Sequence, residues 1–531
     1  MYSYANPKEV LQYTNNKEIA DHKRRLLETY EISSGKLKTK VEITARKRLT
    51  YYNLLLPEIG IATVALIRDI KERILSSMDL SSNMFSDPQV MKELRNVLAQ
   101  EAGRLLQKEL LSMKPELKDH LIQILINDTL GLGDMEFLLN DNYIEEIVIN
   151  SVREPVRVYH KKYGWMNTNI QMESENDTLD YAHMIARQVG REITTLNPRL
   201  DAYLSNGDRV NATLNPISIK GHTITIRKFV RDPWTATDMI RNRTISSEAM
   251  ALIWLAMQYE MNIIISGGTA SGKTSFLNTC MPFIQPNHRI ISIEDTKELQ
   301  LPDFLYWCPL LTREPNHEGK GEVTMLDLLV NTMRMRPDRI IVGEIRKQRE
   351  AEVLFEAMHT GHSVYATLHA DTCAQTISRL TNPPISIPHS TLDSVHLNVV
   401  MFRDRRRGFR RVFEMGEFVP RENKGTGDVK YYPKIIYKWS PKNDVLGACG
   451  EEIRLYEKIS SYTELSTAEV MKDIETKREI LEWLVKNNVR QIEDFGKFMN
   501  YYYIDTETVL SALLRRESPW KLIEGNPEDI G

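Results

Sequence analysis

The chain has 531 residues, 42% hydrophobic and 27% charged, an ordinary globular composition over a length that predicts two or three domains rather than one core. With 69 basic and 72 acidic residues the formal net charge is −3, which excludes a global electrostatic attraction to nucleic acid or anionic lipid. The four cysteines are far apart and none forms a C-x-x-C pair, which argues against a zinc ribbon or disulfide framework and fits a reducing cytoplasm.

Residues 1 to 120 predict an N-terminal helical region. Charged residues are interleaved with leucines there, and Leu94 and Leu105 belong to a stripe at helical spacing. A basic run at 36–52 could contact a membrane surface or a partner, although a solvated face is the favoured interpretation. The first ten residues lack the apolar core of a signal peptide, and the longest uncharged apolar stretch, at 249–259, is too short to span a membrane. We therefore expect a soluble protein whose membrane role is at most peripheral.

Residues 121 to 230 predict a small α+β domain, because short alternating stretches surround a helical piece. Residues 231 to 245 carry Pro233 and several polar residues, and they predict a linker. Residues 246 to 531 alternate strands and helices, the order of a parallel sheet with crossover helices, and end in a helical extension. The fold class expected from this order is α/β.

A glycine-rich stretch at residues 266–275, SGGTASGKTS, fits the phosphate-binding loop pattern without a mismatch. Glycines let successive backbone N–H groups point inward, Lys273 can reach the β- and γ-phosphates of ATP, and the Thr274 hydroxyl can hold Mg²⁺. An isoleucine-rich run precedes the stretch and an apolar helical face follows it, which is the context that such a loop requires. We predict an ATP site made by Gly267, Gly268, Thr269, Ala270, Ser271, Gly272, Lys273, Thr274 and Ser275.

Acidic residues follow two of the predicted strands downstream of this loop. Glu344 lies two residues past the apolar run 340–342, and Glu294 follows the run 289–293, with Glu298 slightly beyond. Carboxylates at the carboxyl ends of parallel strands can order Mg²⁺ or the attacking water. One such acid alone could simply cap a strand or a helix. Two of them after one phosphate loop favour this role for at least one of Glu294 and Glu344.

A further strand is predicted at residues 363–368, between two histidines. The spacing points His362 and His369 to opposite faces, so they do not form a metal pair. A lone histidine is more often a structural hydrogen-bonding residue than a catalyst. At a strand end in this domain, however, His369 could sense the γ-phosphate or contact a neighbouring subunit.

Four segments in order, GGTASGKTS, IISIEDTKEL, MRMRPDRIIVGEIR and TGHSVYATLHA, resemble the Walker A, Asp box, Walker B and His box of the type II/type IV secretion ATPase superfamily. The resemblance covers roughly residues 130 to 415, and both ends of the chain resemble archaeal members, including pilus-assembly and archaellum motor ATPases. It implies a RecA-like P-loop ATPase domain preceded by a PAS-like domain. It also implies a homohexamer that hydrolyses ATP with Mg²⁺ and moves a polytopic membrane platform protein. Such a motor is cytoplasmic and associates peripherally with the cytoplasmic face of the cell membrane.

The resemblance also implies roles for single residues. By motif match, Lys273 binds phosphate, Thr274 and Glu344 are the Mg²⁺ residues, and Glu344 is the Walker B acid. The general base of the Asp box is Glu294 or Glu298, and the sequence does not decide between them.

Arg209 and Arg227 correspond to N-domain arginines of the family that approach the phosphates, where a cation offsets charge in the transition state. The chain also departs from the family pattern in two ways. It lacks the four-cysteine metal subdomain of many bacterial members, so no zinc is expected. The spacing from Arg346 to Glu350 is one residue longer than the common pattern, which leaves the role of Glu350 open.

Two other functional classes fit parts of the sequence. The basic cluster at 403–411 suits a hexameric nucleic-acid motor, but a charged hairpin turn between apolar runs is the favoured interpretation, and no nucleic-acid partner is expected. A nucleotide-binding scaffold without hydrolysis is the other class. Pilus, secretion and archaellum machines stay alternatives within the family.

Overall fold

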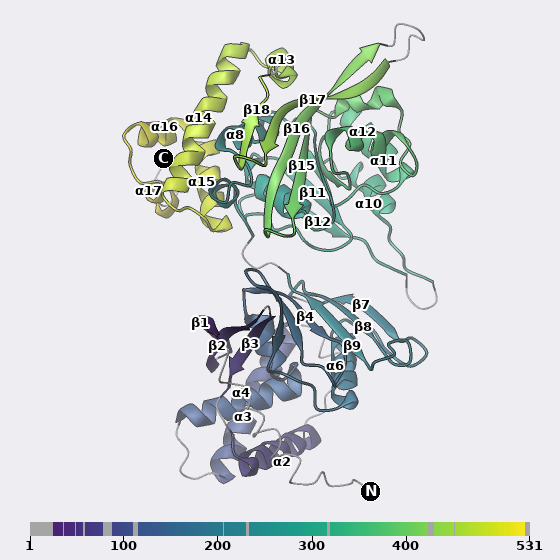
Figure 1. The fold of residues 1–531 in the computed structure, drawn as a ribbon, viewed down its shortest axis with the longest axis vertical. Helices are drawn as coiled ribbons and strands as arrows, with labels where there is room; N and C mark the ends of the chain where they lie inside the picture. The colour runs from purple at the N-terminus through teal and green to yellow at the C-terminus, as the bar shows by residue number, and fades with distance from the viewer. Residues whose placement is uncertain are drawn as a thin grey trace. The chain divides into compact units, whose positions relative to one another are not determined.

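The computed structural model divides the chain into two compact units, residues 1–231 and 232–531 (Figure 1). Each unit has its own apolar cores. The described residues are 25–35, 37–47, 49–56, 59–77, 88–109, 115–204, 206–229, 233–315, 319–422, 429–450 and 452–525. Expectations for residues 1–24 lie outside them.

The first unit is built on a nine-stranded sheet of order β1-β2-β3-β6-β5-β4-β9-β8-β7, with β3 and β6 parallel. Helices α2, α3 and α4 pack on one another around a separate apolar cluster. The elements are β1 Arg25–Ser34, β2 Leu37–Arg46, β3 Leu49–Leu55, α2 Ile61–Ser77, α3 Pro88–Glu109, α4 Pro115–Leu130, α5 Met135–Asn140, β4 Ile144–Ile149, β5 Arg157–His160, β6 Gly164–Thr168, α6 Glu175–Gln188, β7 Arg199–Tyr203, β8 Arg209–Thr213 and β9 Thr223–Arg227.

The prediction of a helical region over residues 1–120 is wrong for Arg25–Ser34, Leu37–Arg46 and Leu49–Leu55, which are the strands β1, β2 and β3. In β2 the side chains of Val41 and Ile43 are fully buried while exposed lysines and a glutamate alternate with them, which is the period of a half-buried strand. These strands extend the same sheet as β4 to β9, so the α+β domain begins earlier in the chain than expected.

The predicted linker over 231–245 is also wrong in its second part. Helix α7, Ala236–Arg241, lies within it and belongs to the second unit. Ala236 and Met239 are buried, and the Asp238 carboxylate forms an ion pair with Arg490 at 2.7 Å. Apolar packing and this ion pair tie the segment to the helical C-terminal extension, so it is not a free connection.

The second unit holds another nine-stranded sheet, of order β12-β11-β13-β14-β10-β15-β16-β17-β18. The strands from β12 to β15 are parallel neighbours, as predicted, and β16, β17 and β18 add an antiparallel extension. The strands are β10 Ile263–Gly267, β11 Arg289–Glu294, β12 Tyr306–Leu311, β13 Arg339–Val342, β14 Ser363–Leu368, β15 Leu397–Asp404, β16 Phe409–Glu422, β17 Val429–Ser440 and β18 Val445–Ala448.

Helices cover both faces of this sheet. Ile263 and Ile265 of β10 join an apolar cluster with α8 and α14, whereas Ile264, which points the other way, joins a cluster with α11 and α12. The helices are α8 Ser247–Gln258, α9 Lys273–Cys280, α10 Met325–Thr332, α11 Gln348–His359, α12 Cys373–Thr381, α13 Arg454–Tyr462, α14 Thr467–Lys486, α15 Ile492–Ile504, α16 Thr506–Leu514 and α17 Trp520–Glu524, with short 3₁₀ turns η3 Met281–Phe283 and η4 His389–Ser394. The predicted helical C-terminal extension is therefore present.

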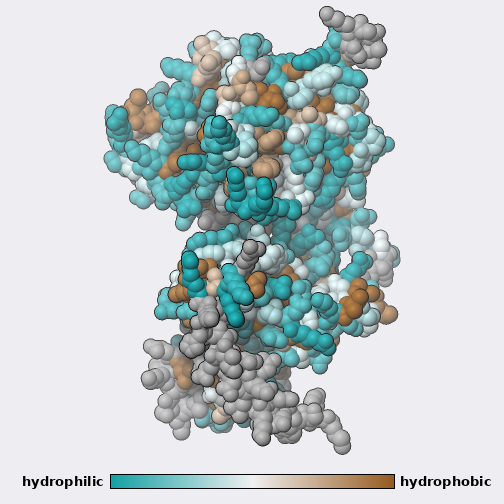
Figure 2. Space-filling view, in the orientation of Figure 1, coloured by the Kyte–Doolittle hydropathy of each residue, from teal (hydrophilic) through white to brown (hydrophobic). Residues whose placement is uncertain are grey.

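Hydrophilic residues predominate on the visible face of both units, with small apolar groups between them (Figure 2). Within the described ranges, no helix combines the length and the apolar character that crossing a bilayer demands.

Candidate nucleotide site

The glycine-rich stretch has the strand–loop–helix context that the sequence predicts. β10 ends at Gly267 and α9 begins at Lys273, so residues 268–272 form the connecting loop. β10 is buried along its whole length between the parallel strands β14 and β15. The loop therefore opens at the carboxyl edge of the sheet and leads into a helix, where backbone N–H groups are available to an anion.

Backbone geometry explains glycine at two positions of this loop. Gly267 has a φ of +151°, and a Cβ added there would lie 2.5 Å from the carbonyl oxygen of Met401. Gly272 has a φ of +94°, and a Cβ there would lie 3.1 Å from Cδ of Arg410. Side chains at these two positions would fill the loop or strain its backbone. Glycine leaves the cradle open, so that a phosphate can approach the backbone closely.

Replacing Gly267 with alanine should lower the free energy of unfolding of the second unit by about 2 to 4 kcal/mol. Two costs add up: the alanine would be strained at this φ, and its Cβ would clash with the Met401 carbonyl oxygen. Gly361→Ala is a matched control, since Gly361 has a φ of +93° but open space around it. That control should cost only about 1 kcal/mol. Chemical denaturation measures both, and equal losses would show that the clash with Met401 is absent.

Lys273 is the cation of the loop, and its Nζ donates to the carbonyl oxygen of Gly268 at 3.1 Å. Burial lowers the pKa of Lys273, whereas the nearby charges of Glu344, Glu298 and Asp371 raise it. The charges of three carboxylates therefore act on the Lys273 amine. Two of them, Glu344 and Glu298, are acids that the sequence analysis singled out.

Strand register brings these acids to the loop. Ile293 of β11 pairs with Val342 of β13, which pairs with Ala366 of β14, and Leu368 of β14 pairs with Ser266 of β10. The carboxyl ends of the four parallel strands therefore meet at one edge of the sheet. Residues that follow β11 and β13 lie on the same edge as the loop that follows β10.

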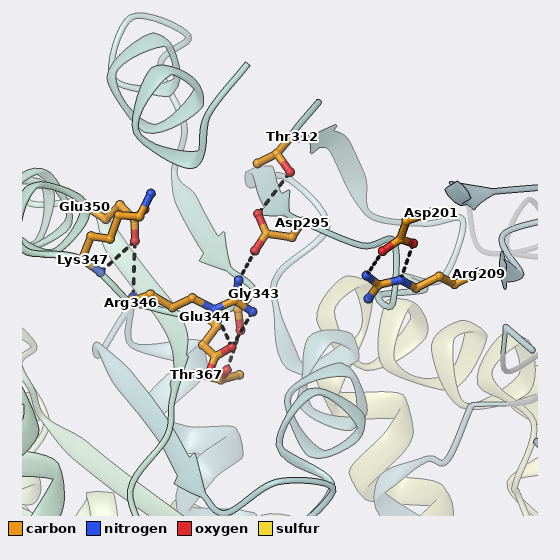
Figure 3. A network of polar contacts seen from close by, with 10 residues as sticks. All are labelled: Asp201, Arg209, Asp295, Thr312, Gly343, Glu344, Arg346, Lys347, Glu350 and Thr367. Atoms are coloured by element: carbon orange, nitrogen blue, oxygen red, sulfur yellow. Dashed lines mark hydrogen bonds and ion pairs between the residues drawn. The ribbon is translucent and has the colours of Figure 1, made fainter. Parts of the chain in front are cut away.

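Glu344 is partly exposed and is held by Arg346 (Figure 3). Nε and Nη2 of Arg346 both donate to Oε2 of Glu344, at 2.9 and 2.7 Å, and Nη1 donates to Oδ2 of Asp295 at 2.6 Å. Thr312 donates its hydroxyl to Oδ1 of Asp295 at 3.1 Å. One arginine thus joins the acid after β13 to the turn after β11.

Glu294, the last residue of β11, is buried with only 2% of its surface exposed. Its Oε1 accepts the backbone N–H groups of Glu298 and Leu299 at 3.0 and 3.2 Å. Burial raises the pKa of Glu294 to about 7, against the lowering effect of these two hydrogen bonds. Glu294 therefore shapes the turn that presents Glu298. Of the two, Glu298 is the acid whose charge acts on Lys273.

The buried carboxyl of Glu294 should make the stability of the second unit depend on pH. Its pKa is about 7 in the fold against an ordinary 4.5, so between these values the folded state binds more protons than the unfolded chain. The protonated carboxyl makes its whole contribution to the free energy of unfolding below pH 4.5, and this contribution, up to about 3 kcal/mol, is lost as the pH rises through the folded-state pKa of about 7. Between about pH 5 and pH 8, thermal unfolding without nucleotide should show a steeper fall in Tm for the wild type than for Glu294→Gln. Parallel profiles would mean that this carboxyl is ionised throughout.

His369 and Asp371 reach the loop from the segment after β14. Nε2 of His369 lies 3.0 Å from the hydroxyl of Thr269, on an exposed surface. Asp371 was not predicted from the sequence, yet a Cβ on Gly268 would lie 2.8 Å from its Oδ1. The signal that could have found Asp371 is its position two residues after His369, on the same strand end.

The two arginines predicted for the first unit lie opposite each other, on β8 and β9. Arg209 forms a two-pronged ion pair with Asp201, with distances of 2.7 Å from Nη2 to Oδ2 and 3.0 Å from Nε to Oδ1 (Figure 3). Arg227 ends β9 and pairs in register with Glu146 of β4. Because both belong to the first unit, their approach to the phosphates stays a prediction.

The structure shows where the basic cluster at 403–411 lies and what Glu350 contacts. The basic cluster spans the end of β15, the turn after it and the start of β16, where Asp404 pairs with Phe409, so the hairpin interpretation is confirmed. Glu350 is buried, and its Oε2 accepts the backbone N–H of Lys347 at 3.1 Å. Glu350 therefore caps the start of α11.

The family model for type II/IV secretion system proteins matches residues 168–403 of the chain. An uncharacterized protein of Methanocaldococcus jannaschii is 36% identical over 411 residues, which cover 76% of this chain and 72% of that protein. The chain belongs to the type II/IV secretion system protein family. The type IV secretion system protein PtlH of Bordetella pertussis is 31% identical over 301 residues, covering 50% of this chain and 86% of PtlH. The predicted α/β class is confirmed.

Solved structures of an ATPase and of a motor also match the chain. The VirB11 ATPase of the Brucella suis type IV secretion system, in complex with sulphate, is 24% identical with a TM-score of 0.27, covering 52% of this chain and 93% of that one. The pilus retraction motor PilT with bound ADP is 15% identical with a TM-score of 0.38, covering 73% of this chain and 95% of that one.

Proposed function

We propose that this member of the type II/IV secretion family is a Mg²⁺-dependent ATPase that powers a filament or secretion machine at the cytoplasmic face of a membrane. The observation that carries the proposal is the shared edge of the second sheet, where Glu344 and Glu298 act on Lys273 of the glycine-rich loop. Backbone N–H groups and a lysine favour phosphate, and neighbouring acids can order a metal ion and a water. This combination supports hydrolysis of a nucleoside triphosphate.

The residues around the loop fit Mg²⁺ by their donor chemistry. This ion takes hard oxygen ligands and usually binds through one or two protein groups together with substrate phosphates and waters. Thr274, in the first turn of α9, offers a hydroxyl, and the partly exposed Glu344 offers a carboxylate. When bound, the ion neutralises charge on the β- and γ-phosphates.

The chain's own side chains then divide the work. Lys273 holds the β- and γ-phosphates, and the cradle from Gly267 to Gly272 surrounds them with backbone donors. Glu298 accepts a proton from the attacking water, because it is the Asp-box acid near Lys273. His369, through its contact with Thr269, holds the outer side of the loop.

The cellular setting belongs to the same proposal. PtlH is named a type IV secretion system protein, and PilT is titled a pilus retraction motor. We infer for this chain a cytoplasmic homohexamer that meets a polytopic membrane platform protein and the membrane surface. Pilus, secretion and archaellum machines are the alternatives for the structure that it serves.

Phosphate release by the purified full chain tests the proposal. We expect turnover of ATP with Mg²⁺ and none with EDTA, stimulation by vesicles of acidic lipid, and no response to DNA or RNA. Sedimentation with a non-hydrolysable ATP analogue should show a hexamer. Stimulation by nucleic acid alone would instead support a nucleic-acid motor, and binding of ATP without turnover would support a scaffold.

A further inference from the structure

Arg346 connects the two acidic strand ends, and the phosphate-loop chemistry described above gives it no role. It lies in the turn between β13 and α11, with 57% of its side chain exposed. Its guanidinium donates to Glu344 after β13 and to Asp295 after β11. Ion pairs this exposed contribute little to stability. What the arginine fixes is the position of two carboxylates relative to each other.

We propose that Arg346 is a positioning residue that couples Glu344 to the turn carrying Glu298, so that both acids are held at the phosphate loop before the substrate arrives. The inference rests on the proposed ATPase function, in which Glu344 orders the metal and Glu298 accepts the proton. It adds a residue that touches neither substrate nor water and acts through the two acids.

The coupling runs through the turn of residues 295–299. The buried Oε1 of Glu294 accepts the backbone N–H groups of the last two residues of this turn, which fixes its far end. Asp295 at its near end is held on both carboxylate oxygens, by Arg346 on Oδ2 and by Thr312 on Oδ1. The turn is therefore fastened to β11 at one end and to the β13 side at the other.

An arginine suits this position because its planar fork offers donors in fixed directions. Nε and Nη2 donate to Glu344 while Nη1 donates to Asp295, so one rigid group fixes the two carboxylates relative to each other. A lysine keeps the charge but has a single nitrogen on a flexible stem. Arg346→Lys should therefore retain the charge balance of the site and lose the coupling.

The first test needs no nucleotide. Hydrogen exchange of the full chain should be several-fold faster at the amides of residues 295–299 in Arg346→Ala than in the wild type, with an unchanged Tm. Arg349→Ala is the matched control, because Arg349 is 80% exposed and forms a single ion pair with Glu352 on the same helix. It should leave exchange in the turn unchanged. Equal exchange in wild type and Arg346→Ala would overturn the inference.

The second test is a double-mutant cycle on ATP turnover with Arg346→Ala, Asp295→Asn and the pair. Each single variant should lower kcat by about 10- to 100-fold with KM for ATP changed less than about 3-fold, because misplaced acids slow the reaction without loosening the substrate. The double variant should be no slower than the slower single one. Multiplying losses, or a loss confined to KM, would contradict coupling through this ion pair.

Failure of the proposed function would look different. A wild type without turnover, or turnover that survives Lys273→Ala, would remove the ATPase assignment while the exchange result could still stand. A wild type that turns over ATP, with Arg346→Ala equally fast, would remove the positioning role alone.

Discussion

Lys273→Ala should lower ATP turnover by at least about 100-fold. Lys273 is the cation of the glycine-rich loop, its amine donates to the Gly268 carbonyl, and the charges of three carboxylates raise its pKa against the lowering effect of burial. Removing it leaves negative phosphates facing Glu344 and Glu298 without the lysine's compensating charge. Both nucleotide affinity and the rate of the chemical step should fall, because charge grows on the γ-phosphate oxygens in the transition state.

Phosphate release and binding of a fluorescent ATP analogue measure the two effects separately. Lys442→Ala is a suitable control, since Lys442 is an exposed lysine of the same unit in the turn between β17 and β18. That variant should match the wild type in both assays. Turnover that persists in Lys273→Ala would show that the activity comes from elsewhere in the chain or from a contaminant.

Glu298→Gln should lower kcat by about 100-fold or more while nucleotide binding persists, because the amide cannot accept a proton from the attacking water. Glu294→Gln should have a much smaller effect. The amide oxygen of glutamine can still accept the backbone N–H groups of Glu298 and Leu299, which is the work that Oε1 of Glu294 performs. The contrast follows from burial, since Glu294 is enclosed and Glu298 lies near Lys273.

Single-turnover rates of both variants, with binding measured alongside, decide the assignment. Circular dichroism and Tm at about pH 7 serve to confirm that each variant folds. The reverse ranking, with Glu294→Gln slow and Glu298→Gln fast, would show that the buried Glu294 is the general base and that Glu298 is not.

The nucleotide loop could be predicted from sequence because its geometry is local. The strand before it, the glycines within it and the helix after it are all encoded within twenty residues, and β10 and α9 flank the loop as predicted. The strand at 363–368 was also predicted from a local pattern, the alternation of residues between His362 and His369. Glu344 followed from the same reasoning applied to β13.

Features that depend on distant parts of the chain could not be predicted in the same way. The exposed Lys38 and Lys40 beside the buried Val41 look like a solvated helix face until β2 pairs with β1 and β3, and β3 pairs with β6 far along the chain. The choice between Glu294 and Glu298 depends on which carboxylate the turn after β11 buries, and no spacing rule states this. The links of Asp295 to Arg346 and to Thr312 join residues from three separate segments.

A structure of the full chain with Mg²⁺ and a non-hydrolysable ATP analogue tests the central claim most directly. We predict the triphosphate in the cradle of residues 267–275, with the Lys273 amine on its β- and γ-phosphates and the carboxylates of Glu344 and Glu298 facing the terminal one. A ligand bound away from this cradle, or bound there with both carboxylates remote from it, would contradict the account.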